Sequence, residues 1–110
     1  MAHTRVFSSC GGIAVLFALL APVPAGATGD LCREFLQAAD SGECIENVTY
    51  RLVIRLGPGH AASVVSAALR ALSERESQQR ALGCAGDIAT QAIAAGADPD
   101  DVLEATAAGL

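Results

Sequence analysis

Four carboxylates fall within seven residues near the end of the chain: Asp98, Asp100, Asp101 and Glu104. Clusters of carboxylates bind hard cations such as calcium when the ligands are spread around a turning loop. The calcium-loop pattern, D-x-D-x-D-G with a glutamate at the twelfth position, is absent here. Pro99 indicates the first position of a helix, which makes Asp98 its N-cap and places Asp100 and Asp101 at the positive end of the helix dipole. We therefore predict a helix cap at this cluster and no metal site.

Cysteine and histidine are the other residue types here with metal-binding or nucleophilic chemistry. Beyond residue 27 the chain holds Cys32, Cys44, Cys84 and a single histidine, His60. Zinc sites and redox sites use closely spaced cysteines, C-x₂₋₄-C or C-x-x-C, and neither spacing occurs. A cysteine–histidine nucleophile would also need a group that orients the histidine. We predict no catalytic residue, no metal ligand and no cofactor, and we do not expect an enzyme.

The three cysteines instead indicate one disulfide, because small secreted domains are commonly held together by such bonds, and the third cysteine is left free or pairs with another chain. Cys44 can reach Cys84 if the helices that begin at these residues touch at their starts, since a disulfide needs Cα atoms closer than about 7 Å. Cys32 with Cys44 would close a shorter loop, but an ideal helical hairpin puts these two residues at opposite ends. We favour the Cys44–Cys84 pairing, which makes Cys32 the candidate free thiol.

The N-terminus has the layout of a secretory signal peptide. His3 and Arg5 form a basic head, an apolar run extends from Gly12 to Val23, and the small residues before Thr28 form a cleavage site. The run of twelve residues is short against the roughly 20 that a helix needs to span a bilayer. We predict a signal peptide over residues 1–27, a secreted or periplasmic product, and no stable membrane insertion after processing.

Residues 28–110 then form one small acidic domain. They carry all twelve acidic residues and six of the seven arginines, a net charge of −6 with histidine neutral, and the chain has no lysine. An acidic surface repels nucleic acid and anionic membranes, so neither is expected as a partner. Phe35 and Tyr50 are the only aromatic residues in this part, so the core is thin and a covalent staple is expected. Glu43 and Glu46 are expected as solvated side chains of one helix start.

Two stretches, residues 44–72 and 84–110, show the same ordered series of residue types. Each begins with a cysteine, continues with aliphatic residues, has a glycine at Gly57 or Gly96, and ends in a leucine. A duplicated helical hairpin explains this series, since each copy would cover the apolar face of the other. We predict an all-α fold of short helices in two stacked helical-hairpin-like repeats.

The segment from residue 48 to residue 56 fits two structures. Its alternating apolar residues and its β-branched content are typical of a strand. No other stretch after residue 27 offers a pairing partner, so a strand would pair with its own copy in a homodimer. A helix that starts near Glu43 gathers the apolar residues on one face: Ile45, Val48, Leu52 and Leu56. We favour the helix, because the matching segment of the second repeat is alanine-rich.

End signals predict two further helices. Asp30 is a suitable N-cap for a helix from Leu31 to Ala39. Ser73 and Glu76 have the S-x-x-E spacing of a capping box, which would start a short helix that extends to Leu82. A single long bent helix in this region is the alternative.

These features together favour a small exported protein that works without catalysis. We expect a protein–protein interaction or structural module of the cell envelope or periplasm, with an unidentified protein as its partner or a second copy of the chain in a homodimer. Stacked helical hairpins usually act by presenting a surface. The alternative is a carrier of a small apolar ligand or lipid, because a core of small side chains leaves room between the helices.

Overall fold

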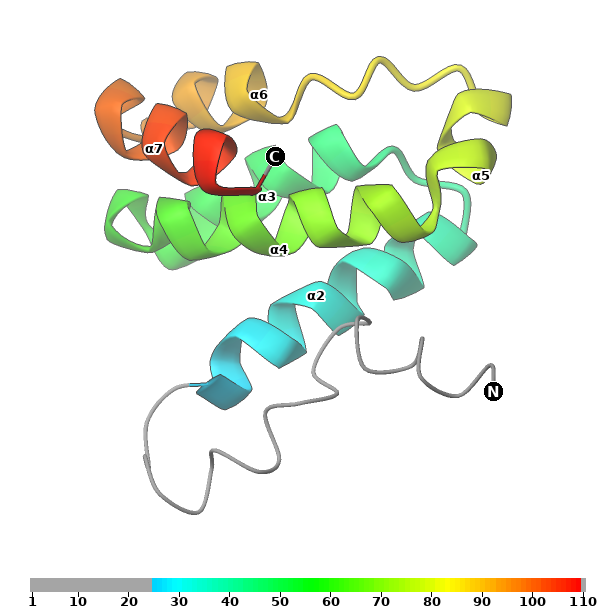
Figure 1. Ribbon diagram of the computed structural model, residues 1–110, viewed down its shortest axis with the longest axis horizontal. Coiled ribbons are helices and arrows are strands. Elements are labelled where there is room, and N and C mark those ends of the chain that lie inside the picture. Colours follow the sequence, from blue (N-terminus) through cyan, green and yellow to red (C-terminus); the bar gives the residue numbers. More distant parts are fainter. Residues whose placement is uncertain (1–24, 110) are drawn as a thin grey trace.

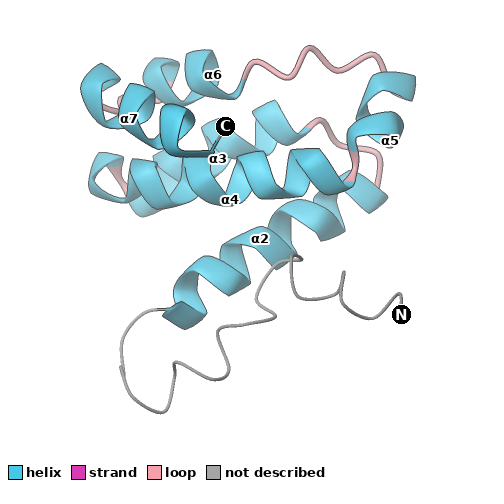
Figure 2. Ribbon diagram, viewed as in Figure 1, coloured by secondary structure: helices cyan, strands magenta, loops and turns pink. Residues whose placement is uncertain are grey.

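The computed structural model of the chain describes residues 25–109, and every regular element in this part is a helix (Figure 2). The elements are α2 (Ala25–Asp40), α3 (Ile45–Leu56), the 3-10 helix η2 (Pro58–His60), α4 (Ala61–Glu74), α5 (Glu76–Ala81), α6 (Ile88–Ala94) and α7 (Pro99–Gly109). The prediction of an all-α fold is confirmed for these residues. The signal peptide predicted for residues 1–27 lies almost wholly outside them.

Helix α4 is the centre of the fold, because it contacts α2, α3, α6 and α7. In Figure 1, α2 crosses below α4, whereas α6 and α7 lie above it. The buried residues of α4 are small: Ala61, Val64, Val65, Ala67, Ala68 and Ala71. Small side chains allow close approach of helix backbones, so α4 can pack against four neighbouring helices. The largest fully buried side chain of the core is Phe35 of α2.

The segment that fitted both a helix and a strand is helix α3. Ile45, Val48 and Leu52 are fully buried, as the helical interpretation predicts. The hydroxyl of Thr49, also buried, donates a 3.0 Å hydrogen bond to the carbonyl oxygen of Ile45 one turn earlier. Leu56 departs from the predicted buried face, because it is 37% exposed at the end of the helix. The strand alternative is wrong for this segment.

Two helical hairpins follow from glycines that end α3 and α6. Gly57 has a φ of 98° and Gly96 a φ of 110°, a backbone region that other residues rarely adopt. Each glycine turns the chain into the next helix, which makes the pairs α3–α4 and α6–α7. The pairs also face each other element by element, since α3 contacts α6 and α4 contacts α7.

Two predicted helix starts are wrong. α2 begins at Ala25, so Asp30 lies inside the helix, where it forms an exposed 3.4 Å ion pair with Arg33 and caps nothing. The short helix predicted near residue 76 exists as α5, but Arg75 is its N-cap residue. The Ser73 hydroxyl donates to the Arg70 carbonyl oxygen instead, so no capping box forms.

None of the helices in residues 25–109 is both long and apolar enough to cross a membrane.

Candidate functional site

Residues 75–86, which include α5 and the chain after it, contact the turn between α2 and α3. We call this segment the 75–86 clasp. Its contacts reach residues 39–46 through an ion pair, side-chain hydrogen bonds, a disulfide and a carboxylate that accepts two backbone amides. The chain thus closes on itself over a distance of about 40 residues in sequence.

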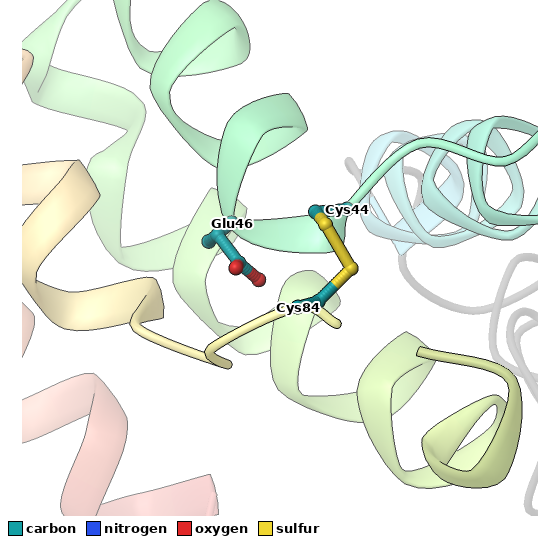
Figure 3. Close-up of side chains that lie close together, drawn as sticks. All are labelled: Cys44, Glu46 and Cys84. Atoms are coloured by element: carbon teal, nitrogen blue, oxygen red, sulfur yellow. A yellow bond between two sulfur atoms is a disulfide. The ribbon is translucent and has the colours of Figure 1, made fainter. Parts of the chain in front are cut away.

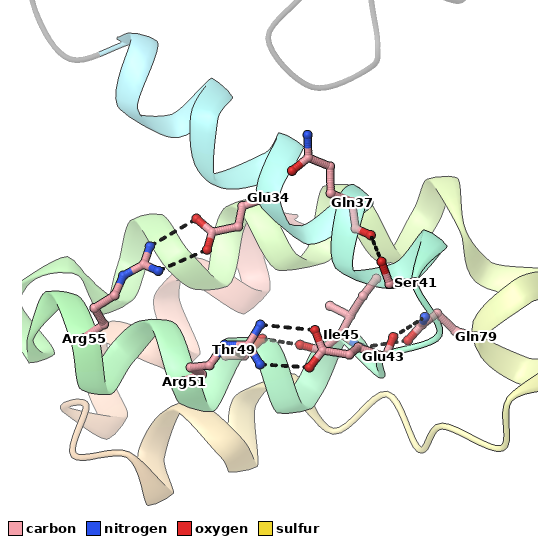
Figure 4. Close-up of polar contacts among 9 residues, drawn as sticks. All are labelled: Glu34, Gln37, Ser41, Glu43, Ile45, Thr49, Arg51, Arg55 and Gln79. Carbon is pink, nitrogen blue, oxygen red and sulfur yellow. Dashed lines mark hydrogen bonds and ion pairs between the residues drawn. The ribbon is translucent and has the colours of Figure 1, made fainter.

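Gln79 is the buried centre of the clasp, with only 2% of its surface exposed. The Ile45 amide donates a 2.8 Å hydrogen bond to Gln79 Oε1, and Gln79 Nε2 donates a 3.0 Å bond to the Glu43 carbonyl oxygen (Figure 4). The first amides of a helix have no partner within the helix. The N-cap residue Cys44 supplies no side-chain bond. Gln79 therefore supplies, from a distant helix, the bond that a local cap would make.

The end of α2 is held by the same segment. Gln78 Nε2 donates a 2.7 Å hydrogen bond to the carbonyl oxygen of Ala39, one of the last in α2. Arg75 Nε lies 2.9 Å from Asp40 Oδ1, and this hydrogen bond holds the pKa of Asp40 below its usual value. One helix end and the next helix start are thus fixed by one six-residue helix and the residue before it.

Two further ion pairs tie α3 to its surroundings (Figure 4). Arg51 lies 2.8 Å from Glu43, and the hydrogen bond from its guanidinium holds the pKa of Glu43 below its usual value. Arg55 contacts Glu34 of α2 at 3.1 Å. All four side chains remain partly solvent-exposed, so these pairs orient the helices more than they stabilise them.

Cys44 and Cys84 form a disulfide with a Cα–Cα distance of 5.5 Å (Figure 3). The predicted pairing is confirmed, and the alternative Cys32–Cys44 bridge does not form. The bridge joins the start of α3 to the end of the clasp, where both residues are half-buried. Cys32 departs from the prediction of a free thiol: it is disulfide-bonded, and the described residues include no free cysteine.

Glu46 is buried, so the prediction of a solvated side chain at this position is wrong. It is only 7% exposed, and its Oε2 and Oε1 accept the amides of Ala85 and Gly86 at 2.8 and 3.2 Å. The carboxylate therefore holds the chain just after Cys84, beside the disulfide. Its oxygen and the two cysteine sulfurs all lie within 4.8 Å of one another (Figure 3).

Neither Gln79 nor Glu46 was singled out correctly from the sequence. Gln79 lies in the polar run "SERESQQR", where nothing separates a buried glutamine from its solvated neighbours. Glu46 had a usable signal. It follows Cys44 by two residues, so the predicted disulfide already brings the chain after Cys84 close to its carboxylate.

No known protein family, curated protein or solved structure matches this chain. The function must therefore be inferred from the residues that the structure describes. Cys44 and Cys84 are joined in a disulfide, and no described contact joins His60, exposed in η2, to a cysteine.

The predicted cap residues lie at the start of α7. The Asp100 amide donates a 2.8 Å hydrogen bond to Asp98 Oδ1, which is the contact that an N-cap makes, and Pro99 is the first residue of the helix. Asp100 and Asp101 follow in the first turn. All four residues are exposed and belong to the surface.

The outer side of α7 combines these charges with an apolar residue. We call it the acidic α7 face, and it consists of Asp100, Asp101, Leu103 and Glu104. Helical spacing places these residues opposite the buried Val102 and Ala105. Leu103 is 60% exposed, more than any other large apolar residue of the described part. Residues 82–109 contain five acidic side chains and no arginine, so nothing in this stretch neutralises the face.

Proposed function

We propose that the chain is an exported, non-catalytic binding protein that recognises a positively charged surface of another protein through the acidic α7 face. In this proposal residues 1–27 are removed as a signal peptide and residues 28–110 act in the periplasm or outside the cell. The Cys44–Cys84 disulfide supports export, because such bonds persist in oxidising compartments.

We also propose that residues 44–72 and 84–110 arose by duplication of one helical hairpin. Three features support this origin. Both hairpins turn at a glycine of positive φ, both follow a cysteine of the same disulfide, and matching helices contact each other, α3 with α6 and α4 with α7. A duplicated hairpin leaves the outer side of the last helix without a neighbour, which is the side that bears the acidic α7 face.

The distribution of charge is the observation that carries the binding function. Five arginines in residues 25–81 form ion pairs with carboxylates of the same segment: Arg33, Arg51, Arg55, Arg75 and Arg80. In residues 82–109 all charged side chains are acidic. Uncompensated charge around an exposed leucine attracts an oppositely charged partner and offers it an apolar contact at the centre. The same charge repels a second copy of α7, which disfavours a homodimer through this face.

Site-specific photocross-linking in the exported fraction of the native cell tests this proposal. A photoreactive residue replaces Leu103 in one variant and Ile54, 58% exposed on α3, in a matched control. We expect one cross-linked protein from position 103, weaker at high salt, and no such product from position 54. The doubly neutralised variant Asp101→Asn/Glu104→Gln should lose most of the product, whereas Glu74→Gln, on α4, should keep it.

Equal cross-linking from both positions, or an undiminished product in the neutralised variant, would contradict the proposal. A product consisting of two copies of the chain would contradict it as well, and would support the homodimer instead. The groove between α4 and α7 does not favour the apolar-ligand carrier. The groove between α4 and α7, of about 390 Å³, is open and lined partly by Ser66, Arg70 and Ser73.

A further inference from the structure

We propose that reduction of the Cys44–Cys84 disulfide converts its corner of the clasp into a binding site for a thiophilic divalent cation such as Zn²⁺, with Cys44, Cys84 and Glu46 as ligands. The three groups come from two segments about 40 residues apart and meet within 4.8 Å (Figure 3). The sequence does not indicate this site, because its two cysteines are far apart in the chain.

The backbone around the site suits a metal with little rearrangement. Tetrahedral zinc with Zn–S bonds of about 2.3 Å separates two sulfurs by about 3.8 Å. The Cα atoms of Cys44 and Cys84 are already 5.5 Å apart, so rotation of the two side chains after reduction provides that separation. Gln79 continues to hold the start of α3 against the clasp, because its hydrogen bonds do not involve the disulfide.

Glu46 is oriented and has lone pairs to spare. Each carboxylate oxygen has two lone pairs, and the amides of Ala85 and Gly86 take one on each oxygen. Hydrogen bonds of this kind fix the direction of a metal-ligating carboxylate. No arginine of the described residues forms an ion pair with Glu46, so a cation would not have to displace one.

Solvent reaches the site at Cys84. Cys84, Ala85 and Gly86 line an open groove of about 260 Å³ that also borders α5. This groove admits a reductant and a metal ion, and it leaves space for water as the fourth ligand. Two thiolates and one carboxylate favour zinc or cadmium over magnesium or calcium, which prefer oxygen ligands.

The chemical step requires a dithiol reductant. One thiolate of the dithiol attacks a sulfur of the Cys44–Cys84 bond, which breaks and releases the other cysteine as a thiolate. The second thiol of the reagent then attacks the mixed disulfide, so the reagent leaves as a cyclic disulfide and both cysteines are reduced. Binding of the divalent cation displaces the two thiol protons into water.

Cobalt titration of the full-length chain tests the site. Cys10→Ser and Cys32→Ser form the background, so that Cys44 and Cys84 are the only cysteines. The protein is reduced with a dithiol, which gel filtration then removes under anaerobic conditions. We expect Co²⁺ to give thiolate-to-metal charge-transfer absorption at one ion per chain, Zn²⁺ to abolish it, and the oxidised protein to give none.

Two matched variants identify the third ligand. Glu46→Gln should weaken Co²⁺ binding at least about tenfold, since even loss of a group that only orients a ligand costs about 10–100-fold. Glu43→Gln, three residues away and outside the trio, should leave it unchanged. As a measurement independent of these variants, Zn²⁺ should raise the thermal midpoint of the reduced protein and leave that of the oxidised protein unchanged. Absence of charge-transfer absorption, equal affinities of the two variants, or no rise in the midpoint overturns the proposal.

Discussion

The contact between the 75–86 clasp and the start of α3 uses a carboxylate in the opposite way to the acidic α7 face. Where the clasp meets the start of α3, Gln79 of the clasp and Glu46 of α3 are buried, and their polar atoms bond backbone groups of distant segments. On the α7 face, Asp101 and Glu104 are exposed and form no ion pair within the described residues. The clasp therefore stabilises the fold, while the carboxylates of the α7 face remain exposed to solvent. The difference teaches that a carboxylate stabilises the fold where distant backbone amides reach it, and remains a surface charge where they do not.

Removal of the disulfide should have the largest effect on this comparison. The bridge closes a loop with a sequence separation of 40, so its loss should lower the free energy of unfolding by about 3–4 kcal/mol through the entropy of the unfolded chain. Chemical denaturation of Cys44→Ala/Cys84→Ala against the oxidised protein measures the loss. A loss below about 1 kcal/mol would show that the hydrogen bonds of the clasp suffice without the bridge.

Truncation of Gln79 should come second. Gln79→Ala leaves the buried Ile45 amide and the partly buried Glu43 carbonyl without their partner, which we expect to cost about 2–3 kcal/mol. Gln78→Ala is the matched control, because it removes a single bond from a less buried side chain and should cost about 1 kcal/mol. Chemical denaturation of the two variants measures the free energy of unfolding that each has lost. A larger loss for Gln78→Ala would refute the central role of Gln79.

The cap of α7 should have a smaller, local effect. Asp98→Ala removes the acceptor of the Asp100 amide and should cost about 1 kcal/mol. Asp98→Asn keeps an acceptor oxygen and should be nearly neutral by the same thermal or chemical unfolding measurement. If both variants lost equal stability, the charge of Asp98 and not its capping bond would be responsible.

Acid should weaken the ion pairs by the smallest amount. The pKa of Glu43 is held below its usual value of 4.5 by Arg51, so the pair stabilises the fold at higher pH and this contribution disappears as pH falls through the lowered pKa. The exposed pair is worth well under about 1 kcal/mol because solvent screens it. Arg51→Gln should thus be less stable than the parent at neutral pH, and the difference should shrink as the pH falls through the lowered pKa of Glu43. A difference that persists in acid would contradict the electrostatic origin.

Much of the fold was predictable because it depends on local patterns. Apolar spacing predicted α3, Asp98 and Pro99 predicted the start of α7, and the order of cysteines within the proposed repeats predicted the Cys44–Cys84 bridge. The clasp was not predictable in the same way. Gln79 and Glu46 act through contacts with segments 34 to 40 residues away in sequence. The chain neighbours of Gln79 carry no trace of its contacts, and only Cys44, two residues before Glu46, indicates the contact that Glu46 makes.

The most direct test compares the unfolding of Gln79→Ala with that of Leu103→Ser under identical conditions. We predict a loss of about 2–3 kcal/mol for Gln79→Ala and a change within about 0.5 kcal/mol for Leu103→Ser, because the exposed leucine contributes little to the core. Equal losses would mean that Leu103 is part of the packed structure. That result would contradict both the division of roles and the availability of the acidic α7 face.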